Sequence, residues 1–211
     1  MNNIITKIEV QKFNKERVNI YVDDEFFIGC SMELIYKEGI KKGEAVHKEK
    51  LQSIIIEDNF MKAKSRSLRY LGKSHKTEKE VVGKLKEEGY EISIIDRTIC
   101  FLKEYDFIND ERYVELFIKE KLKKWGENRI KYELLRKGIE EKLVLDKIYS
   151  IDSEEKNKVL YEVALKKYNS LIKSENDSFK INRKLNDYLL RRGYGFDEIK
   201  SVINKIVKAG D

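Results

Sequence analysis

Proline is absent from this chain, and cysteine nearly so, with Cys30 and Cys100 the only two. The absence of proline favours helices joined by short polar or glycine-containing turns. The two cysteines lie far apart and lack the spacing of a metal site, which indicates a reduced, intracellular protein. Long apolar runs and a signal-peptide pattern are also missing, so we expect a cytoplasmic protein that neither spans nor enters a membrane.

Motifs for catalysis and cofactor binding are missing as well. The chain has no glycine-rich phosphate loop, no His-Glu-x-x-His or Cys-x-x-Cys pattern and no serine nucleophile elbow. Its two histidines, His47 and His75, are isolated in the sequence. We therefore expect no catalytic residue, no bound metal and no enzymatic activity.

Charged residues of both signs make up 39% of the chain, and they are interspersed. Such a composition is typical of solvated helix faces, and the helical recurrence of apolar residues argues against a disordered chain. The net charge of +6 comes from residues 60–211, because residues 1–59 are slightly acidic. A basic excess is compatible with a nucleic acid or an acidic protein as partner and does not distinguish them.

The first 30 residues alternate with the period of β-strands, most clearly at Val18, Ile20 and Val22. Two clusters of turn-forming residues divide them into three short antiparallel strands. A short helix capped by Ser31 and a second helix over residues 48–59 are expected to follow. Three strands are marginally stable alone, so this extension either caps the helical body or binds a partner.

From residue 60 on, apolar residues recur around three glycines, Gly89, Gly138 and Gly193. Five apolar columns keep their distances from these glycines: Val81, Ile130 and Leu185; Leu85, Leu134 and Leu189; Ile95, Val144 and Ile199; Ile99, Ile148 and Ile203; Leu102, Ile151 and Ile206. We infer a tandem repeat of three copies. Each glycine should end a helix in the left-handed conformation, and the next residue should fold back on the leucine four positions before the glycine.

Each copy resolves into three helices. The predicted helices cover residues 60–72, 76–88, 91–105, 110–124, 127–137, 140–150, 153–173, 179–192 and 195–208. The predicted fold class is mainly α, with three tandem three-helix repeats forming an elongated, curved body and a small N-terminal strand-and-helix extension. The predicted domains are the extension, residues 1–59, and the repeats, residues 60–109, 110–152 and 153–211.

Local signals refine these helices. Asn109 is the expected N-cap of the helix over residues 110–124, and Thr77 and Ser178 are placed to cap the second helices of the first and third copies. We expect Leu116 and Phe117 to form the apolar stripe of the helix that Asn109 caps.

Three stretches of the repeat region carry motifs that are specific in combination. They are Ile108-Asn109-Asp110-Glu111-Arg112-Tyr113; Gly126…Arg129-Ile130…Glu133-Leu134…Lys137-Gly138-Ile139; and Tyr70-Leu71…Ser74…Glu80…Lys84-Leu85…Gly89-Tyr90. In these motifs the chain resembles the RecX family of bacterial recombination regulators, over nearly all of residues 60–208, and its strand-rich start is similar to that of Gram-positive members. It departs from the family at Asp106, where glycine is usual, and at Gly72-Lys73, where arginine usually follows the Tyr-Leu pair.

The resemblance implies a curved helical body of three three-helix repeats, together with a function that the composition does not show. Members of the family bind the RecA recombinase filament on single-stranded DNA and lie in its helical groove. They inhibit its recombinase, ATPase and coprotease activities, which modulates DNA repair and the SOS response. The resemblance implies that such an inhibitor needs no cofactor, and we expect it to act as a monomer.

Basic residues gather on the helix surfaces of the repeats, most densely in the second. The residues expected to contact the filament or its DNA are Arg112, Lys119, Lys123, Arg129, Lys131, Arg136, Lys137, Arg191 and Arg192. The pairs that directly precede a repeat glycine, Arg136-Lys137 and Arg191-Arg192, are better explained as cations that complement a helix C-terminus. Regularly spaced basic residues on a repeat protein also suit a partner that is itself periodic.

Two other functions remain open at this point. A sequence-nonspecific nucleic-acid-binding repeat protein would bind single- or double-stranded DNA with a steep salt dependence and without a recombinase. A helical scaffold for an unrelated acidic protein would show neither DNA binding nor recombinase inhibition.

Overall fold

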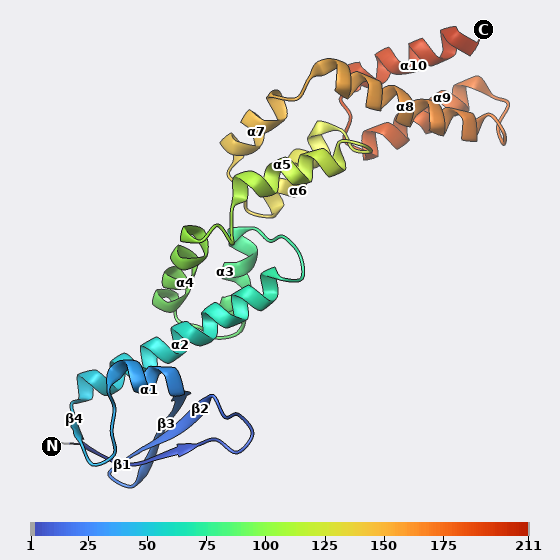
Figure 1. Cartoon of the computed structure of the whole chain (residues 1–211). Helices are drawn as coiled ribbons and strands as arrows, with labels where there is room; N and C mark the ends of the chain where they lie inside the picture. Colours follow the sequence, from blue (N-terminus) through green and yellow to red (C-terminus); the bar gives the residue numbers. More distant parts are fainter. Residues whose placement is uncertain (1–2, 211) are drawn as a thin grey trace. The chain divides into compact units, whose positions relative to one another are not determined.

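The computed structural model describes residues 3–210, which form two compact units. Unit 1 takes in Met1–Ser74 and Val81–Ile108, and unit 2 takes in His75–Glu80 and Asn109–Asp211. The described chain is mainly helical, with one small sheet near its N-terminus (Figure 1). This confirms the predicted fold class of helical triplets that follow a short strand region.

Unit 1 begins with a four-stranded antiparallel sheet in the order β3-β2-β1-β4. Its strands are β1 (Asn3–Val10), β2 (Arg17–Val22), β3 (Glu25–Ser31) and β4 (Ala45–Val46). The three predicted strands are confirmed, and Val18 and Ile20 lie in the core as their alternation indicates. The prediction missed β4, which is only two residues long. Helix α1 (Met32–Glu38) follows β3 and ends at Gly39 with φ +62°.

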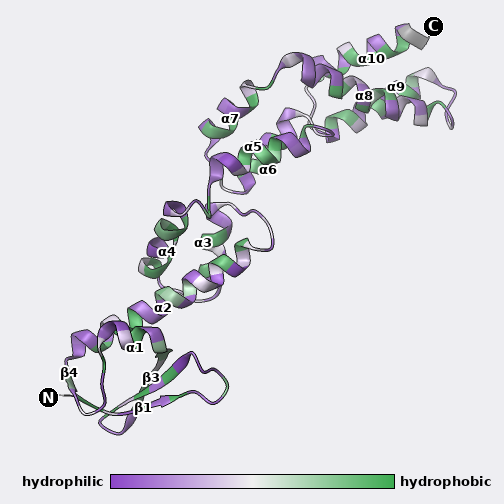
Figure 2. Ribbon diagram, viewed as in Figure 1, coloured by the Kyte–Doolittle hydropathy of each residue, from purple (hydrophilic) through white to green (hydrophobic). Residues whose placement is uncertain are grey.

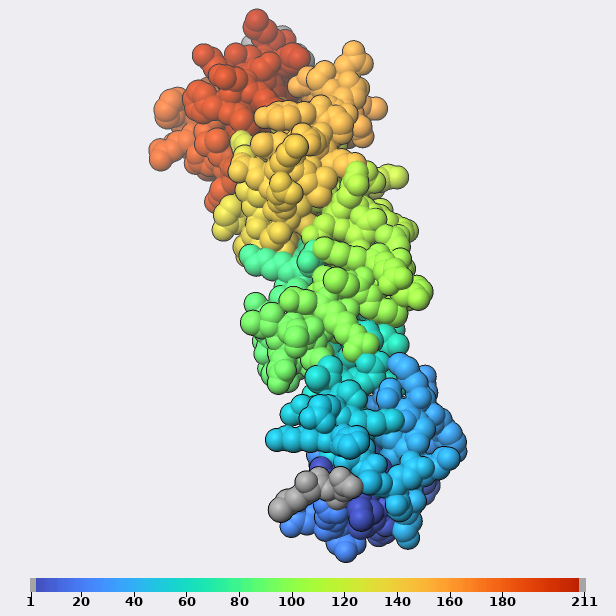
Figure 3. Space-filling view, turned by 90° about the vertical axis from the view of Figure 1, so that its left-hand side faces the viewer, coloured from blue at the N-terminus to red at the C-terminus, as the bar shows by residue number. Residues whose placement is uncertain are grey.

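Helix α2 (Lys48–Leu71) corrects the prediction of two helices over residues 48–59 and 60–72. No glycine or proline interrupts this stretch, so nothing in the sequence stops the first helix. Leu51 and Ile54 pack in the core beneath the sheet, while Ala63 belongs to the core of the first helical triplet. One helix therefore carries both cores of unit 1, and Figure 3 shows it in cyan directly beside the blue strand region.

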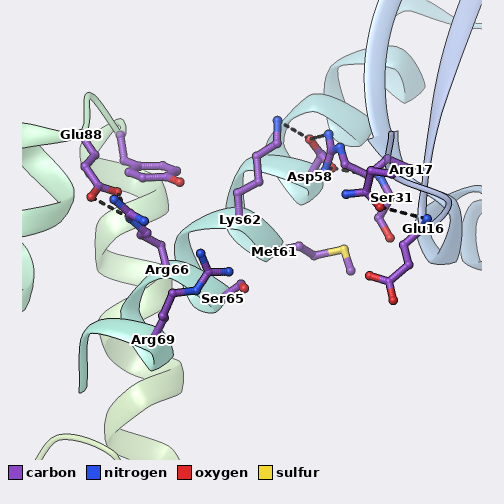
Figure 4. A pocket seen from close by; sticks show the side chains of 12 residues that line it. Glu16, Arg17, Ser31, Asp58, Met61, Lys62, Ser65, Arg66, Arg69 and Glu88 are labelled. Atoms are coloured by element: carbon purple, nitrogen blue, oxygen red, sulfur yellow. Dashed lines mark hydrogen bonds and ion pairs between the residues drawn. The ribbon is translucent and has the colours of Figure 1, made fainter. Parts of the chain in front are cut away.

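A buried carboxylate fixes the sheet to α2. Asp58 is fully buried and accepts hydrogen bonds from the guanidinium of Arg17 at 3.1 Å to each oxygen, and its Oδ2 pairs with Lys62 Nζ at 2.6 Å (Figure 4). The backbone N–H of Ser31 also donates to Asp58, at 3.1 Å. The Ser31 side chain makes no capping bond to α1, so the predicted cap is not formed. Losing one partner of such a buried pair is costly, since the other charge would be left uncompensated.

The remaining helices form the three predicted triplets, and α2 supplies the first helix of the first one. They are α3 (Glu78–Glu87), α4 (Ile92–Glu104), α5 (Asp110–Lys121), α6 (Glu127–Arg136), α7 (Glu141–Tyr149), α8 (Ser153–Leu171), α9 (Ser178–Arg191) and α10 (Phe196–Gly210). Each triplet has its own apolar cluster. Figure 2 shows hydrophobic residues in green along the helices, interspersed with hydrophilic ones in purple. The five apolar columns belong to these clusters, with Ile151 and Ile203 only partly buried.

The three repeat glycines end their helices as predicted. Gly89, Gly138 and Gly193 have φ of +82°, +86° and +84°. The N–H of the residue after each glycine donates to the C=O of the leucine four positions before that glycine, for example from Ile139 to Leu134 at 3.2 Å. This is the Schellman geometry, which satisfies carbonyls that would otherwise be left free at the helix end.

Two local predictions are wrong. The buried stripe of α5 consists of Val114 and Ile118 together with the following Leu122; of the two predicted residues, Phe117 packs partly buried against this stripe, but Leu116 is 43% exposed. Helix α9 is capped by the side chain of Asp177, not by Ser178, since an aspartate one residue earlier reaches the same N–H groups.

The other two caps are confirmed. The Asn109 side chain accepts from the N–H of Arg112, at the start of α5. Thr77 and Glu80 form a reciprocal capping box, in which each side chain accepts from the other residue's N–H. Across residues 3–210, no helix is long and apolar enough to cross a bilayer.

Candidate interaction surface of unit 2

Unit 2 contains all nine basic residues that the sequence nominated, and several of them meet at the end of α9. There the N–H of Gly126 donates to the C=O of Arg192 at 2.8 Å, and the N–H of Asn128 donates to the C=O of Gly193 at 3.2 Å. The free N–H groups at the start of α6 thus bind the free carbonyls at the end of α9, which satisfies both helix ends and aligns their dipoles.

Two predicted cations complete this contact, which we call the Gly126 joint. The guanidinium of Arg192 donates to the C=O of Lys124 at 2.8 Å, and that of Arg129 donates to the C=O of Arg191 at 3.1 Å. A Cβ on Gly126 would overlap the backbone of Gly193. Glycine is required here by close backbone approach.

A second contact, the Thr77 joint, lies at the other end of α6. The Thr77 hydroxyl donates to the C=O of Lys137 at 2.8 Å, and Lys137 Nζ lies 2.7 Å from a carboxylate oxygen of Glu80. Partial burial lowers the pKa of Lys137, but its hydrogen bonds with Glu80 and Tyr113 outweigh burial and leave the pKa raised. Lys137 is therefore a charged side chain held in place by its partners.

An aromatic row connects the two joints. The rings of Tyr113 and Phe117 on α5 stack with centroids 6.0 Å apart, and Phe117 lies 6.3 Å from Trp125. Cations cover both ends: Lys137 Nζ lies 5.5 Å from the Tyr113 ring, and the Arg129 guanidinium lies 4.4 Å from the Trp125 ring. The rings are partly exposed, and such cation–aromatic contacts suit both base stacking and protein recognition.

The other nominated residues are more exposed and are not gathered at one point. Lys131 pairs with Glu141 at 2.6 Å, and Arg136 pairs with Glu133 at 2.8 Å. Arg191 donates to the C=O of Asp187 within its own helix. The remaining three are exposed: Arg112, Lys119 and Lys123. Among the residues that the structure describes, the side chains of Lys119 and Lys123 make no hydrogen bond or ion pair.

Lys119 also lines a groove of about 440 Å³ between α5, α7 and the start of α8, with Ile118 and Leu122 on its apolar side. Lys147 in the same groove bonds to Glu111 and Glu115, each at 2.6 Å. These hydrogen bonds raise the pKa of Lys147. In this groove, Lys119 is therefore a nominated residue whose charged side chain has no ion-pair partner among the described residues and lies next to the apolar side chains of Ile118 and Leu122.

The structure therefore distinguishes two groups among the nine nominated residues. Arg129, Lys137 and Arg192 hold the two joints, whereas the side chains of Lys119 and Lys123 are exposed and pair with no described residue. Sequence reasoning missed the aromatic row, although the four-residue spacing of Tyr113 and Phe117, with Trp125 eight residues further on, was visible as a helical signal. Over residues 3–210, no group of three or more His, Cys, Asp or Glu side chains is placed to hold a metal ion.

Comparison with known proteins was made on the whole chain. Four family models match: the regulatory protein RecX N-terminal domain over residues 3–47, and the first, second and third RecX three-helix domains over residues 63–102, 109–146 and 153–203. Two similar relatives, each named regulatory protein RecX, come from Clostridium perfringens and Clostridium acetobutylicum. They are 48% and 49% identical, over 96% and 97% of this chain and 95% and 96% of theirs.

Two solved structures have a similar fold. A crystal structure of a regulatory protein RecX has a TM-score of 0.73 at 24% identity and covers 96% of this chain and 99% of that one. The crystal structure of RecX from Lactobacillus salivarius has a TM-score of 0.63 at 26% identity, with coverage of 71% and 97%. The chain belongs to the RecX family of regulatory proteins.

Proposed function

We propose that this protein binds the RecA recombinase filament on single-stranded DNA and inhibits its recombinase, ATPase and coprotease activities. It would thereby modulate DNA repair and the SOS response. The observation that carries the proposal is the identity of nearly half of all residues with proteins named regulatory protein RecX, over almost the full length of both chains. No cofactor is required, since the inhibitor acts by binding.

Unit 2 offers the physical means for such binding. Lys119, on α5, and Lys123, just after its end, are exposed, and their side chains pair with no described residue. The partly exposed aromatic row runs along the same stretch, from Tyr113 and Phe117 on α5 to Trp125 beyond its end. A recombinase filament repeats one protomer surface at a regular rise, so a repeat protein can contact successive protomers. Two modest contacts on one chain then act together through effective concentration.

The test is the DNA-dependent ATPase activity of RecA on single-stranded DNA with the protein added below one molecule per recombinase. Strong inhibition at that ratio is expected from action on the filament. Inhibition only at amounts that saturate the DNA would instead support a sequence-nonspecific DNA-binding protein.

The contact is tested by the double charge reversal Lys119→Glu and Lys123→Glu, which leaves both joints intact. We expect the concentration needed for half-maximal inhibition to rise about tenfold or more, because two charged groups would then repel the partner that they attract in the wild type. The matched control is Lys158→Glu with Lys166→Glu, two exposed lysines of α8 in the same unit. Equal inhibition by the test and control variants would move the recombinase contact away from α5.

A further inference from the structure

Unit 1 carries a basic stripe that the function proposed for unit 2 does not use. Lys62, Arg66, Arg69 and Lys73 recur at intervals of three and four residues along the end of α2 and the turn after it. This spacing places them on one face of the helix, about one cation for each turn of about 5.4 Å. All four residues are exposed.

The stripe borders two hollows that share Arg66 and Arg69. A small one of about 80 Å³ is lined by these two arginines with Tyr70, Lys73 and Lys84, so four of its five lining side chains are cationic. The larger one, of about 350 Å³, extends from there along α2 to the Asp58 network (Figure 4). Its walls are mostly polar and include Ser65 and Asn14.

An internal anion already lies beside this stripe. The Glu88 carboxylate accepts from Arg66 Nε at 2.7 and 2.9 Å, and Lys84 Nζ lies 3.4 Å away. The hydrogen bond from Arg66, aided by Lys84, holds the pKa of Glu88 below its ordinary value. The side chains of Arg69 and Lys73 make no hydrogen bond or ion pair with any residue that the structure describes, so their positive charge is uncompensated.

We propose that this hollow and groove bind the phosphodiester backbone of single-stranded nucleic acid, with Glu88 as an internal competitor for the phosphate. Guanidinium groups bind phosphate through paired N–H donors, and lysines add point charges. A row of cations at regular intervals matches a chain of regularly spaced phosphates. An acidic protein partner is less suited, because protein interfaces need an apolar centre and these walls are polar.

This site is independent of the recombinase, so its test uses the protein alone. The full chain is titrated against fluorescently labelled oligothymidylate, with fluorescence anisotropy as the readout, at several salt concentrations. The variant Arg69→Glu with Lys73→Glu removes the two uncompensated cations. Its matched control, Lys41→Glu with Lys42→Glu, makes the same charge change at two exposed lysines between α1 and β4 of unit 1.

We expect the test variant to lose affinity at least tenfold and to reduce the slope of log affinity against log salt by about 1.4, at about 0.7 for each phosphate that is no longer neutralised by a cation. The control should keep both the wild-type affinity and the wild-type slope. Glu88→Gln should bind several-fold more tightly, because it frees Arg66 and Lys84, and an unchanged circular dichroism spectrum and unfolding midpoint show that the gain does not come from misfolding.

Three results would overturn the proposal. The first is the same affinity for the test and control variants, and the second is no gain for Glu88→Gln. The third is equally tight binding, with equal sensitivity to the variants, for polyglutamate or for inorganic phosphate. Polyglutamate would identify an acidic protein as the ligand, and inorganic phosphate would identify the free ion. If the variant Arg69→Glu with Lys73→Glu still inhibits RecA, the nucleic-acid site of unit 1 is separate from the function proposed for unit 2.

Discussion

The two joints of unit 2 use the ends of α6 in different ways. At the Gly126 joint, the backbone N–H groups of Gly126 and Asn128 donate to backbone carbonyls at the end of α9. Gly126 and Gly193, one on each side, allow the two backbone segments to approach closely. At the Thr77 joint, the contact is made by side chains, with the Thr77 hydroxyl on one carbonyl and the Lys137–Glu80 ion pair beside it.

The difference shows that one repeat position can serve two kinds of contact. Gly138 and Gly193 occupy the same place in their repeats and share the same left-handed conformation. A Cβ on Gly193 would overlap the main-chain N and Cα of Arg129, whereas one on Gly138 would overlap Lys79 from Cβ to Cδ. Lys79 Cγ and Cδ can rotate away, so the side-chain joint can relieve more of its overlap than the backbone joint can.

Gly193→Ala should therefore have the largest effect. It adds strain of about 1–2 kcal/mol from the positive φ to a clash of about 1–3 kcal/mol that only backbone movement can relieve. We expect unit 2 to lose about 3 kcal/mol of unfolding free energy. Urea unfolding followed by the fluorescence of Trp125, the single tryptophan, measures this, because Trp125 lies beside the Gly126 joint.

Gly89→Ala is the matched control for that loss. Gly89 has the same positive φ, but no atom lies within 4 Å of the position that a Cβ would take. Its cost should be the conformational part alone, about 1 kcal/mol, seen in the urea unfolding of unit 1 by circular dichroism. Equal losses at Gly89 and Gly193 would show that the close approach at the Gly126 joint is not needed.

Gly138→Ala should fall between these two, at about 2 kcal/mol. It has the same conformational cost, and its overlap with Lys79 is relieved partly by rotation of Cγ and Cδ and partly by a small backbone shift that moves the Lys79 Cβ. The Trp125 unfolding curve again reports the loss. A loss as large as that of Gly193→Ala would contradict the distinction between the two joints.

Thr77→Val tests the side-chain joint directly. Valine keeps the shape but removes the hydroxyl that caps α3 and binds the C=O of Lys137. We expect a loss of about 1–2 kcal/mol, as for a removed cap and an unsatisfied buried carbonyl. Thr77→Ser keeps the hydroxyl and should lose less than half as much in the same urea titration.

Much of the fold was predictable because its signals are local. The glycine helix ends and the Thr77–Glu80 capping box each depend on residues within about one or two helical turns of one another, and the apolar columns depend on the regular helical period. The continuous α2 was missed because the start of the first repeat was taken as a helix boundary, although no glycine or proline marks one. Leu116 was misassigned because α5 has apolar residues on two faces, and only packing decides which face is buried.

The candidate surface was less predictable for a physical reason. Charge alone nominated Arg129, Lys137 and Arg192, but a lysine or arginine near a helix end binds carbonyls or a nearby acid as readily as a partner. Which of these it does depends on residues more than 50 positions away, as with Lys137 and Glu80. The Asp106 departure shows the reverse: its φ of +54° explains why glycine is usual there.

The smallest expected difference is in pH dependence. Partial burial raises the pKa of Glu80, but hydrogen bonds from Lys137 and from the N–H of Thr77 outweigh it and leave the pKa below the ordinary value of 4.5. The resulting stability is present above the unfolded pKa and is lost as the pH falls through the folded one. Because Glu80 is partly exposed, the loss should be under about 1 kcal/mol.

Between about pH 6 and pH 3.5, Glu80→Gln should flatten the pH dependence of the Trp125 unfolding midpoint. The Gly126 joint is held by backbone groups and arginines, which do not titrate in this range. Arg192→Gln should therefore lower the unfolding free energy of unit 2 by the same amount at about pH 6 and at about pH 3.5. A pH-dependent loss in that variant would show that the two joints are electrostatically alike.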